Sequence, residues 1–223
     1  GGGVGISDFN QDGLQDLYFT SNQSGDKLYQ NLGDFKFKDV SSSALIDIYG
    51  GWKNGIAISD VNGDGLDDIY VCRGGSFENT ADNENLLFIN QGNLTFIESA
   101  AKYGVNDPGI SISAVFFDLE NDGDLDLYVT NRPNTFDNSF LSLAKGKEEN
   151  NRFNSDQLYR NEGGQKFINI TAIAGLQPNF AYGLNVIAGD INDDGYQDLY
   201  VCNDFAENDY VYINQKNGTF KHF

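Results

Sequence analysis

One acidic segment of nine residues occurs four times in the sequence, at residues 8–16, 60–68, 118–126 and 190–198. In each copy, called acidic loops 1 to 4 in chain order, side chains that carry oxygen occupy positions 1, 3, 5 and 9, and glycine occupies position 6. A hard cation such as Ca²⁺ takes roughly six to eight oxygen ligands, and alternate residues of a tight loop can direct carboxylates to one centre. Glycine at position 6 permits the turn that returns position 9 to that centre. The pattern therefore predicts Ca²⁺ binding, with up to four ions, one in each loop.

The predicted ligands are the side chains at positions 1, 3, 5 and 9 and the backbone carbonyl at position 7. Loop 1 contributes Asp8, Asn10, Asp12, Leu14 and Asp16, and loop 2 contributes Asp60, Asn62, Asp64, Leu66 and Asp68. Loop 3 contributes Asp118, Glu120, Asp122, Asp124 and Asp126, and loop 4 contributes Asp190, Asn192, Asp194, Tyr196 and Asp198. Glu120 replaces the Asn of the other loops, and its longer side chain can reach an ion directly or through water.

Two other interpretations of the acidic loops are an EF-hand and a set of turns that bind no ion. An EF-hand opens with the same pattern but requires a bidentate Glu at position 12. That position holds Phe19, Val71, Val129 and Val201, which excludes the EF-hand. The other alternative is that Asp, Asn and Gly form turns without an ion. Four copies of one nine-residue pattern favour ion binding over four independent turns.

Strand-like segments surround each acidic loop. A short apolar segment precedes the loop, and a run rich in β-branched and aromatic residues follows it. A third segment ends in an Asn, and a fourth follows a turn that contains Gly. The first segments, GVGIS, GIAIS, SAVFF and NVIAG, are small and apolar on both faces, as expected of buried inner strands. The Asn residues that end the third segments are Asn31, Asn90, Asn161 and Asn214.

The predicted fold is all-β, with four β-propeller blades of four antiparallel strands each. The repeats span about residues 1–48, 49–106, 107–178 and 179–223, within one propeller region. Four blades can close a ring, but an arc of a larger propeller is the preferred interpretation. Such an arc would expose apolar blade faces and can self-associate through its open edges.

The repeats differ in length mainly between the second and third strands. The distance from the first Asp of a loop to the Asn that ends the third strand is 23, 30, 43 and 24 residues in the four repeats. Because strands alternate in direction, these variable loops must emerge at the end of the blade opposite the acidic loops. The longest spans about Asn131 to Asp156, and its two Phe residues favour a binding loop, with an unstructured insertion as the alternative.

Composition excludes several classes of protein. The chain has 33 Asp and Glu against 14 Lys and Arg, a net charge of -19, which would repel a phosphate backbone, so we expect no nucleic-acid partner. It has no long apolar run, so we expect no membrane insertion. The absence of Met suggests a processed or excised piece. One His leaves little room for His-based sites, and Cys72 and Cys202 are expected to be free thiols because they occupy equivalent positions of separate repeats.

The motif D-x-N-x-D-G-x-x-D followed by L-Y, then L-Y-x-N, then G-x-F, resembles the FG-GAP/VCBS repeat of integrin alpha-chain propellers. The stretch Leu199 to Phe220 is especially similar to repeats of the cartilage acidic protein / ASPIC-UnbV group. This resemblance covers essentially the whole chain. It implies Ca²⁺ between strands one and two, a propeller commonly of about seven blades, an extracytoplasmic location, and adhesion or ligand binding. It does not imply an enzyme, and we expect none.

The functional expectation is a calcium-binding β-propeller module of a secreted or cell-surface protein, periplasmic or attached to the outer membrane if bacterial. Its Ca²⁺ is expected to be structural, and a protein or carbohydrate ligand is expected on the face opposite the acidic loops. One alternative is the propeller part of a polysaccharide-degrading lyase or hydrolase, although the Asp residues that could serve as acid or base are mostly in the acidic loops. A second alternative is a purely structural or assembly module.

Overall fold

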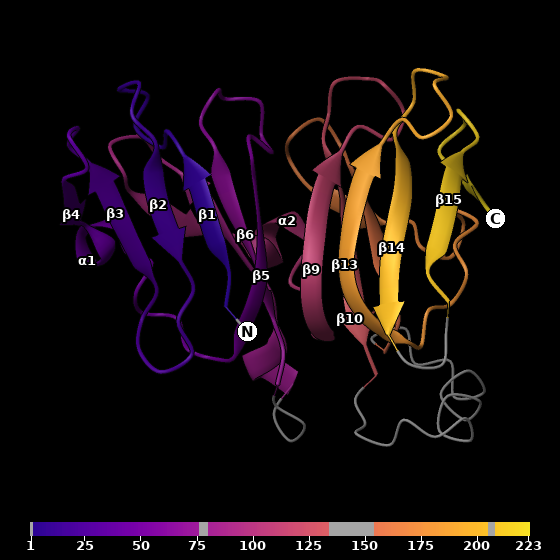
Figure 1. Cartoon of the computed structure of the whole chain (residues 1–223), viewed down its shortest axis with the longest axis horizontal. Helices are drawn as coiled ribbons and strands as arrows, with labels where there is room; N and C mark the ends of the chain where they lie inside the picture. The colour runs from indigo at the N-terminus through magenta and orange to yellow at the C-terminus, as the bar shows by residue number, and fades with distance from the viewer. Residues whose placement is uncertain (1, 76–79, 134–153, 205–207) are drawn as a thin grey trace.

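The computed structural model describes residues 2–75, 80–133, 154–204 and 208–223. In these residues, sixteen strands form four antiparallel sheets, and the strands of each sheet pair in chain order. Figure 1 shows the sheets following one another along the molecule. The predicted all-β unit of four antiparallel strands is therefore confirmed.

Each sheet is built from one continuous stretch of chain. Sheet 1 contains β1 (Val4–Ser7), β2 (Asp16–Phe19), β3 (Lys27–Asn31) and β4 (Phe37–Asp39). Sheet 2 contains β5 (Lys53–Ser59), β6 (Asp68–Arg73), β7 (Leu86–Asn90) and β8 (Phe96–Glu98). Sheet 3 contains β9 (Ile110–Phe117), β10 (Asp126–Arg132), β11 (Gln157–Asn161) and β12 (Phe167–Asn169). Sheet 4 contains β13 (Tyr182–Gly189), β14 (Asp198–Asp204), β15 (Tyr210–Asn214) and β16 (Phe220–His222).

Short helices supplement the sheets. A single turn of α-helix follows the fourth strand in sheet 1, as α1 (Ser41–Ala44), and in sheet 2, as α2 (Ala100–Tyr103). A 3₁₀ turn, Thr80–Asn83, precedes β7. In the described part of the chain, no helix has the length and apolar character needed to cross a membrane.

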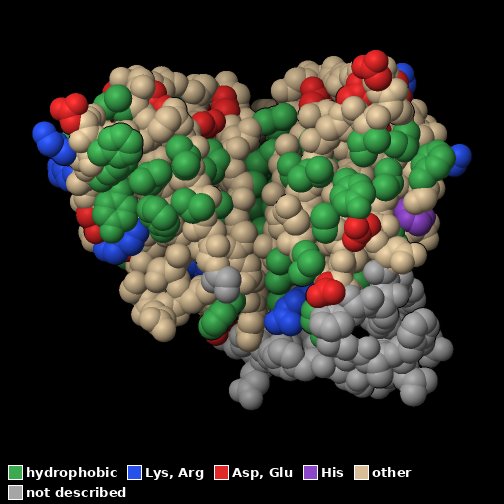
Figure 2. Space-filling model, in the orientation of Figure 1, with side chains coloured by type: hydrophobic (Ala, Val, Ile, Leu, Met, Phe, Trp, Pro, Cys, Tyr) green, Lys and Arg blue, Asp and Glu red, His purple; other side chains and the backbone are tan. Residues whose placement is uncertain are grey.

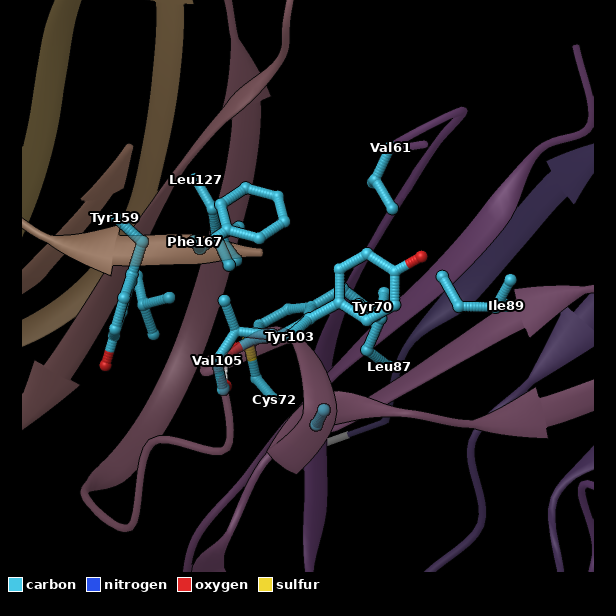
Figure 3. Packing of buried hydrophobic residues seen from close by; sticks show 13 residues of the cluster. Val61, Tyr70, Cys72, Leu87, Ile89, Tyr103, Val105, Leu127, Tyr159 and Phe167 are labelled. Atoms are coloured by element: carbon cyan, nitrogen blue, oxygen red, sulfur yellow. Dashed lines mark hydrogen bonds between the residues drawn. The ribbon is translucent and has the colours of Figure 1, made fainter. Parts of the chain in front are cut away.

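Apolar clusters join each sheet to the next. Side chains of a strand alternate between its two faces, so each sheet can pack on both sides. One cluster joins sheets 1 and 2, a second joins sheets 2 and 3, and a third joins sheets 3 and 4. Figure 3 shows the second cluster, in which Tyr70 and Leu87 of sheet 2 meet Leu127, Tyr159 and Phe167 of sheet 3. We call the side of a sheet that meets the preceding sheet its N-side face, and the other its C-side face.

The first strands are less buried than their composition predicts. In β1, Val4 is 58% and Ile6 is 60% exposed, and most of β5 is half-buried. The small residues instead allow the first strands of neighbouring sheets to approach closely, because β5 lies beside β9 and β9 lies beside β13. A Cβ atom at Gly55 would lie 2.5 Å from the carbonyl oxygen of Ile112 in β9, so only glycine fits there. The expectation of fully buried inner strands is therefore wrong.

The two ends of the sheets carry different connections. The acidic loops join the first strand of each sheet to the second, and Figure 1 places them at the top. The connections from second to third strand leave the opposite end, as the alternation of strand directions requires. The predicted variable loop from Asn131 to Asp156 falls largely outside the described residues.

Candidate metal centre

The acidic loops occupy equivalent places in the four sheets. Position 1 directly follows the first strand of each sheet, and position 9 is the first residue of the second strand. The predicted side-chain ligands therefore lie in a short connection whose two ends are held by neighbouring, hydrogen-bonded strands.

Position 1 is a carboxylate held by backbone N–H groups of its own loop. Asp8 accepts hydrogen bonds from the N–H of Asp12 at 3.0 Å and from that of Gly13 at 2.7 Å. Gly13 has a φ of 87°, a left-handed conformation that glycine adopts without steric cost. The same pair of bonds recurs at Asp60, Asp118 and Asp190. The loop thus fixes one carboxylate before any ion binds.

Positions 3 and 5 face each other across the loop. In loop 1, Asp12 accepts the N–H of Leu14 at 2.9 Å, and the Asn10 amide nitrogen donates to the other oxygen of Asp12 at 2.9 Å. Loops 2 and 4 repeat both contacts. An Asn amide carries its acceptor oxygen opposite its donor nitrogen, so half a turn of the amide would present oxygen to a cation.

Position 9 has a structural role that the sequence did not reveal. Asp68 is fully buried and accepts the N–H of Val61 at 3.1 Å and that of Asn90 at 2.8 Å. It therefore ties the loop to the third strand. Asp16, Asp126 and Asp198 make the same two bonds. Each carboxylate oxygen has a second lone pair, so these bonds leave acceptor capacity for an ion.

Burial and like charge both act on the position 9 carboxylates. Burial raises the pKa of Asp68 to about 7 and that of Asp126 to about 7, while the two backbone N–H groups oppose this shift. The other acidic side chains of the same loop raise both pKa values further by repulsion. A bound cation would reverse that repulsion, because opposite charge favours the ionised form.

Basic side chains approach two of the four loops. Arg160 lies 4.0 Å from Glu120 of loop 3, and Lys216 lies 3.4 Å from Asp194 of loop 4. Burial raises the pKa of Glu120, and Arg160 opposes that shift. Among the described residues, no ion pair involves loops 1 and 2, so those carboxylates have no basic side chain to neutralise them.

The donor chemistry of the loops suits a hard cation. Every predicted ligand atom is a carboxylate, amide or carbonyl oxygen, the set that Ca²⁺ prefers. Within the described ranges, no group of three or more His, Cys, Asp or Glu side chains is arranged to hold a metal ion. Closing the shell would require rotation of the position 3 and 5 side chains around the fixed carboxylate at position 1. The ligand sets remain a prediction.

The Asn that ends each third strand links neighbouring sheets. The amide nitrogen of Asn161 donates to the carbonyl of Leu125 in its own acidic loop at 3.1 Å and to that of Val61 in loop 2 at 3.0 Å. Asn90 and Asn214 make the corresponding pairs of bonds. The sequence shows this Asn in all four repeats, but nothing in its spacing indicates a partner in another sheet.

A second repeated polar contact lies at the far end of the sheets. The residue directly before the third strand is Asp26, Asn85, Asp156 or Asp209. Asp156 accepts the hydroxyl of Tyr128 at 2.8 Å and the N–H of Asn131 at 2.9 Å, and it is 3% exposed. Asp26 accepts the equivalent Tyr18 hydroxyl at 2.6 Å and also pairs with Lys53 at 2.8 Å, with both side chains fully buried. The sequence could have indicated this contact, because every repeat has an acid or an amide directly before its third strand.

The two cysteines do not form a disulfide. Cys72 is buried and Cys202 is half-buried, and both are free. Burial raises the pKa of both thiols. The prediction of free thiols is confirmed, and neither thiol is activated as a nucleophile.

Comparison with known proteins gives matches of two kinds. The chain is similar in fold to the crystal structure of the V. cholerae biofilm matrix protein Bap1, with a TM-score of 0.50 and 17% identity over 98% of this chain and 27% of that one. It thus spans about a quarter of the length of Bap1. A structure of the Photorhabdus luminescens Tc holotoxin pore matches with a TM-score of 0.44 and 18% identity, over 89% of this chain and 8% of that one.

The comparisons of sequence match only part of the chain. A search of curated proteins found no match. Residues 8–71, which contain acidic loops 1 and 2, match the family model of the FG-GAP-like repeat. This match confirms, for residues 8–71, the resemblance drawn from the loop motif.

Proposed function

We propose that the chain is a calcium-binding β-propeller module of a secreted or cell-surface protein, which recognises a protein or carbohydrate ligand. The observation that carries the proposal is the acidic loop, in which backbone N–H groups hold the carboxylate of position 1 in the same way four times. The proposal assigns no catalytic activity to the chain, because the acids that could act as acid or base are mostly the proposed ligands of the ions.

The role proposed for Ca²⁺ is structural. Position 1 follows the first strand and position 9 opens the second, so an ion held by both would tie the two strands together. It would also neutralise carboxylates that repel one another at short range. An ion that binds only the folded chain stabilises it by mass action. Calcium at the concentration found outside cells suits sites of moderate affinity, which favours an extracellular, surface or periplasmic location.

The proposed architecture is an arc of propeller blades. Each sheet has four antiparallel strands in chain order and packs face to face on its neighbours, as blades do. The ligand is assigned to the end opposite the acidic loops, where the connections differ most in length. Variable loops on a repeated scaffold are where recognition usually lies.

The calcium proposal is tested by comparing two acids of loop 4 that lie three residues apart. Asp190 at position 1 is a proposed ligand, whereas Asp193 at position 4 is exposed and is not. Asp190→Asn and Asp193→Asn remove the same charge from the same loop. We expect calcium to raise the unfolding temperature of the wild type relative to chelator. Titration calorimetry should show one Ca²⁺ fewer for Asp190→Asn and an unchanged number for Asp193→Asn.

An unfolding midpoint that is the same with calcium and with chelator would contradict the ion sites. The recognition proposal needs a separate measurement, namely binding of the chain to panels of polysaccharides and extracellular matrix proteins. Where binding is found, folded Asp190→Asn should retain its affinity, because its site is at the other end of the sheet. No binding to either panel would favour the purely structural module.

A further inference from the structure

Hydrogen bonds connect some of the acidic loops directly to one another. They run from position 4, and from position 1 or the residue before it, to positions 6 and 8 of the next loop. Positions 4, 6 and 8 are not proposed ligands, but each lies in the sequence between two positions that are. A bond at one of these positions therefore restrains the ligand residues on both sides of it.

Loops 1 and 2 are joined by two such bonds. The amide nitrogen of Gln11, at position 4 of loop 1, donates to the carbonyl of Gly65, at position 6 of loop 2, at 2.6 Å. The hydroxyl of Ser7, which directly precedes loop 1, donates to the carboxylate of Asp67, at position 8 of loop 2. Both bonds cross the junction at which the C-side face of sheet 1 meets the N-side face of sheet 2.

Loops 3 and 4 are joined in a similar way. The amide nitrogen of Asn121, at position 4 of loop 3, donates to the carbonyl of Gly195, at position 6 of loop 4, at 2.8 Å. The N–H of Asp118, at position 1 of loop 3, donates to the side-chain oxygen of Gln197, at position 8 of loop 4, at 2.8 Å. The first bond uses the same two positions as in loops 1 and 2, and the second ends at the same position 8.

Loops 2 and 3 lack the side chains for these bonds. Position 4 of loop 2 is Gly63, which has no side chain, and position 8 of loop 3 is Leu125, whose side chain forms no hydrogen bond. In the described part of the chain, no hydrogen bond runs directly between these two loops, and Asn161 of the third strand joins sheets 2 and 3 at this end instead. Figure 2 shows acidic side chains at the top of both halves of the molecule, with an indentation between the halves. The four loops therefore form two connected pairs.

We infer that the loops bind calcium as two coupled pairs, loops 1 and 2 and loops 3 and 4, whereas loops 2 and 3 bind it independently of each other. The inference rests on the proposed function, because it concerns the calcium sites proposed above. An ion in one loop of a pair raises the affinity of the other loop for calcium.

The bonds carry this coupling because each pair is linked through a residue that also fixes a proposed ligand. The N–H of Gly65 holds the carboxylate of Asp60 at 2.7 Å, while the carbonyl of Gly65 accepts Gln11. Loop 4 has the same arrangement at Gly195. An ion that orders positions 3 and 5 of the first loop also restrains position 4 between them, and through it the position 6 glycine of the next loop. The next ion then enters a loop that is already partly ordered, which lowers the entropy cost of its binding.

The test follows calcium binding at each loop separately in the full 223-residue chain. The glycine at position 6 donates its N–H to the position 1 carboxylate of its own loop, so its amide signal in a two-dimensional NMR spectrum reports on that loop alone. These glycines are Gly13, Gly65, Gly123 and Gly195. Titration with CaCl₂ then gives a dissociation constant for every loop.

Disabling one loop shows which other loop depends on it. Asp60→Asn disables loop 2, and we expect it to weaken calcium binding in loop 1 by about fivefold or more and to leave loop 3 unchanged. Asp118→Asn should weaken loop 4 by a similar factor and leave loop 2 unchanged. Coupling between two sites is reciprocal, so Asp8→Asn should weaken loop 2 by the factor that Asp60→Asn imposes on loop 1. Asp64→Asn, at position 5, should act like Asp60→Asn, which separates loss of the ion from a fault in folding at one residue.

A second pair of variants tests the bond itself. Gln11→Ala removes the bond from loop 1 to the carbonyl of Gly65 and removes none of the proposed ligands. In this variant, Asp60→Asn should weaken loop 1 by a smaller factor. Gln15→Ala is the matched control, because Gln15 lies in the same loop, is exposed and makes no side-chain hydrogen bond within the described residues. The full factor should remain in this control.

The outcomes distinguish the coupling from the calcium sites. Loops that bind calcium with unchanged affinity when their partner loop is disabled overturn the inference and leave the calcium proposal standing. Equal coupling between loops 2 and 3 also overturns it, and so does a Gln11→Ala chain that keeps the full factor. A wild-type chain whose glycine signals do not respond to calcium contradicts the proposed function itself, and the inference with it.

Discussion

Asp16, Asp68, Asp126 and Asp198 show how one residue type supports two tasks. Each is a predicted ligand, and each also binds the N–H of loop position 2 and the N–H of the Asn that ends the third strand. A buried carboxylate that receives two charge-assisted bonds has a fixed orientation. We expect substitutions at this position to disturb the sheet as well as the ion, which makes positions 1 and 3 the cleaner probes of calcium.

The buried pair of Lys53 and Asp26 gives a stability prediction. Both side chains are fully buried, and the Lys53 ammonium also donates to the carbonyl of Tyr49 at 2.6 Å. Lys53→Met leaves Asp26 buried without its cation, which costs about 3 to 5 kcal/mol of unfolding free energy. The control is Lys27→Met, because Lys27 and Asp39 form a pair of similar length, 2.9 Å, with both side chains more than one-third exposed, so water screens it and its loss should cost much less. Equal losses in urea unfolding would contradict the prediction.

Asp156 gives a pH prediction with a defined sign. Burial raises the pKa of Asp156 to about 6 in the folded chain, above the ordinary value of 3.8. Between these values the folded chain keeps a proton that the unfolded chain has lost, so the stability from this group is present at low pH and lost as pH rises. Relative to Asp156→Asn, the wild-type unfolding free energy should fall by up to about 3 kcal/mol from pH 4 to pH 6.5.

Asp209 supplies the control, because it occupies the same position in sheet 4 but is exposed. The Tyr200 hydroxyl and the N–H of Asn203 lower its pKa. Its contribution is therefore present above the ordinary value and is lost as pH falls below it. The difference between wild type and Asp209→Asn should stay constant from pH 4 to pH 6.5, and a decrease like that of Asp156 would contradict the assigned cause.

At the scale of elements, the contacts between sheets depend on the Asn at the end of the third strand. Asn161→Ala removes the two bonds donated to the carbonyls of Val61 and Leu125 and the one accepted from the N–H of Gly164, at a cost of about 2 kcal/mol. Asn31→Ala removes the bond to the carbonyl of Gln15 and the one accepted from the N–H of Gly33, but no bond to a neighbouring sheet, so it should cost less than Asn161→Ala. Urea unfolding at protein concentrations where the chain is monomeric compares the two. Equal costs would show that the bond to the neighbouring sheet is unimportant.

Much of each element could be predicted from the sequence, because its signals are local. Strand-like segments and the turn residues between them indicated four strands per repeat, and the apolar segments before and after each acidic loop placed it between the first and second strands. The exposure of Val4 and Ile6 could not be predicted, since composition reports apolar character and not which neighbour covers it. The acceptors of Asn90, Asn161 and Asn214 lie in other repeats, beyond the reach of any local pattern.

At the scale of the whole molecule, charge opposes compaction. Thirteen of the 33 acidic residues are proposed to bind an ion through their carboxylates, three each in loops 1, 2 and 4 and four in loop 3. Asp124 is not among them, because its proposed ligand atom is the backbone carbonyl oxygen. Four bound Ca²⁺ would bring the net charge from -19 to about -11 by formal count. The remaining charge still disfavours polyanionic partners and favours solubility.

This charge gives a salt prediction. In chelator, the carboxylates of each loop repel one another, so added NaCl should raise the unfolding temperature by screening them over a Debye length of about 10 Å at 0.1 M. In saturating calcium the same salt series should have a smaller effect, because the ions already neutralise the loops. Differential scanning calorimetry measures both series. Equal salt dependence in calcium and in chelator would locate the repulsion outside the acidic loops.

The direction of the hydrogen bonds between sheets has a consequence for synthesis on the ribosome. Asn90, Asn161 and Asn214 all donate backwards, to a carbonyl that precedes them in the chain. When each of these residues leaves the exit tunnel, the loop that receives it has already been made, and the earlier sheet can serve as a template. Repeated units that fold from the N-terminus onward avoid waiting for distant partners. We therefore expect the sheets to assemble in the order in which they are translated.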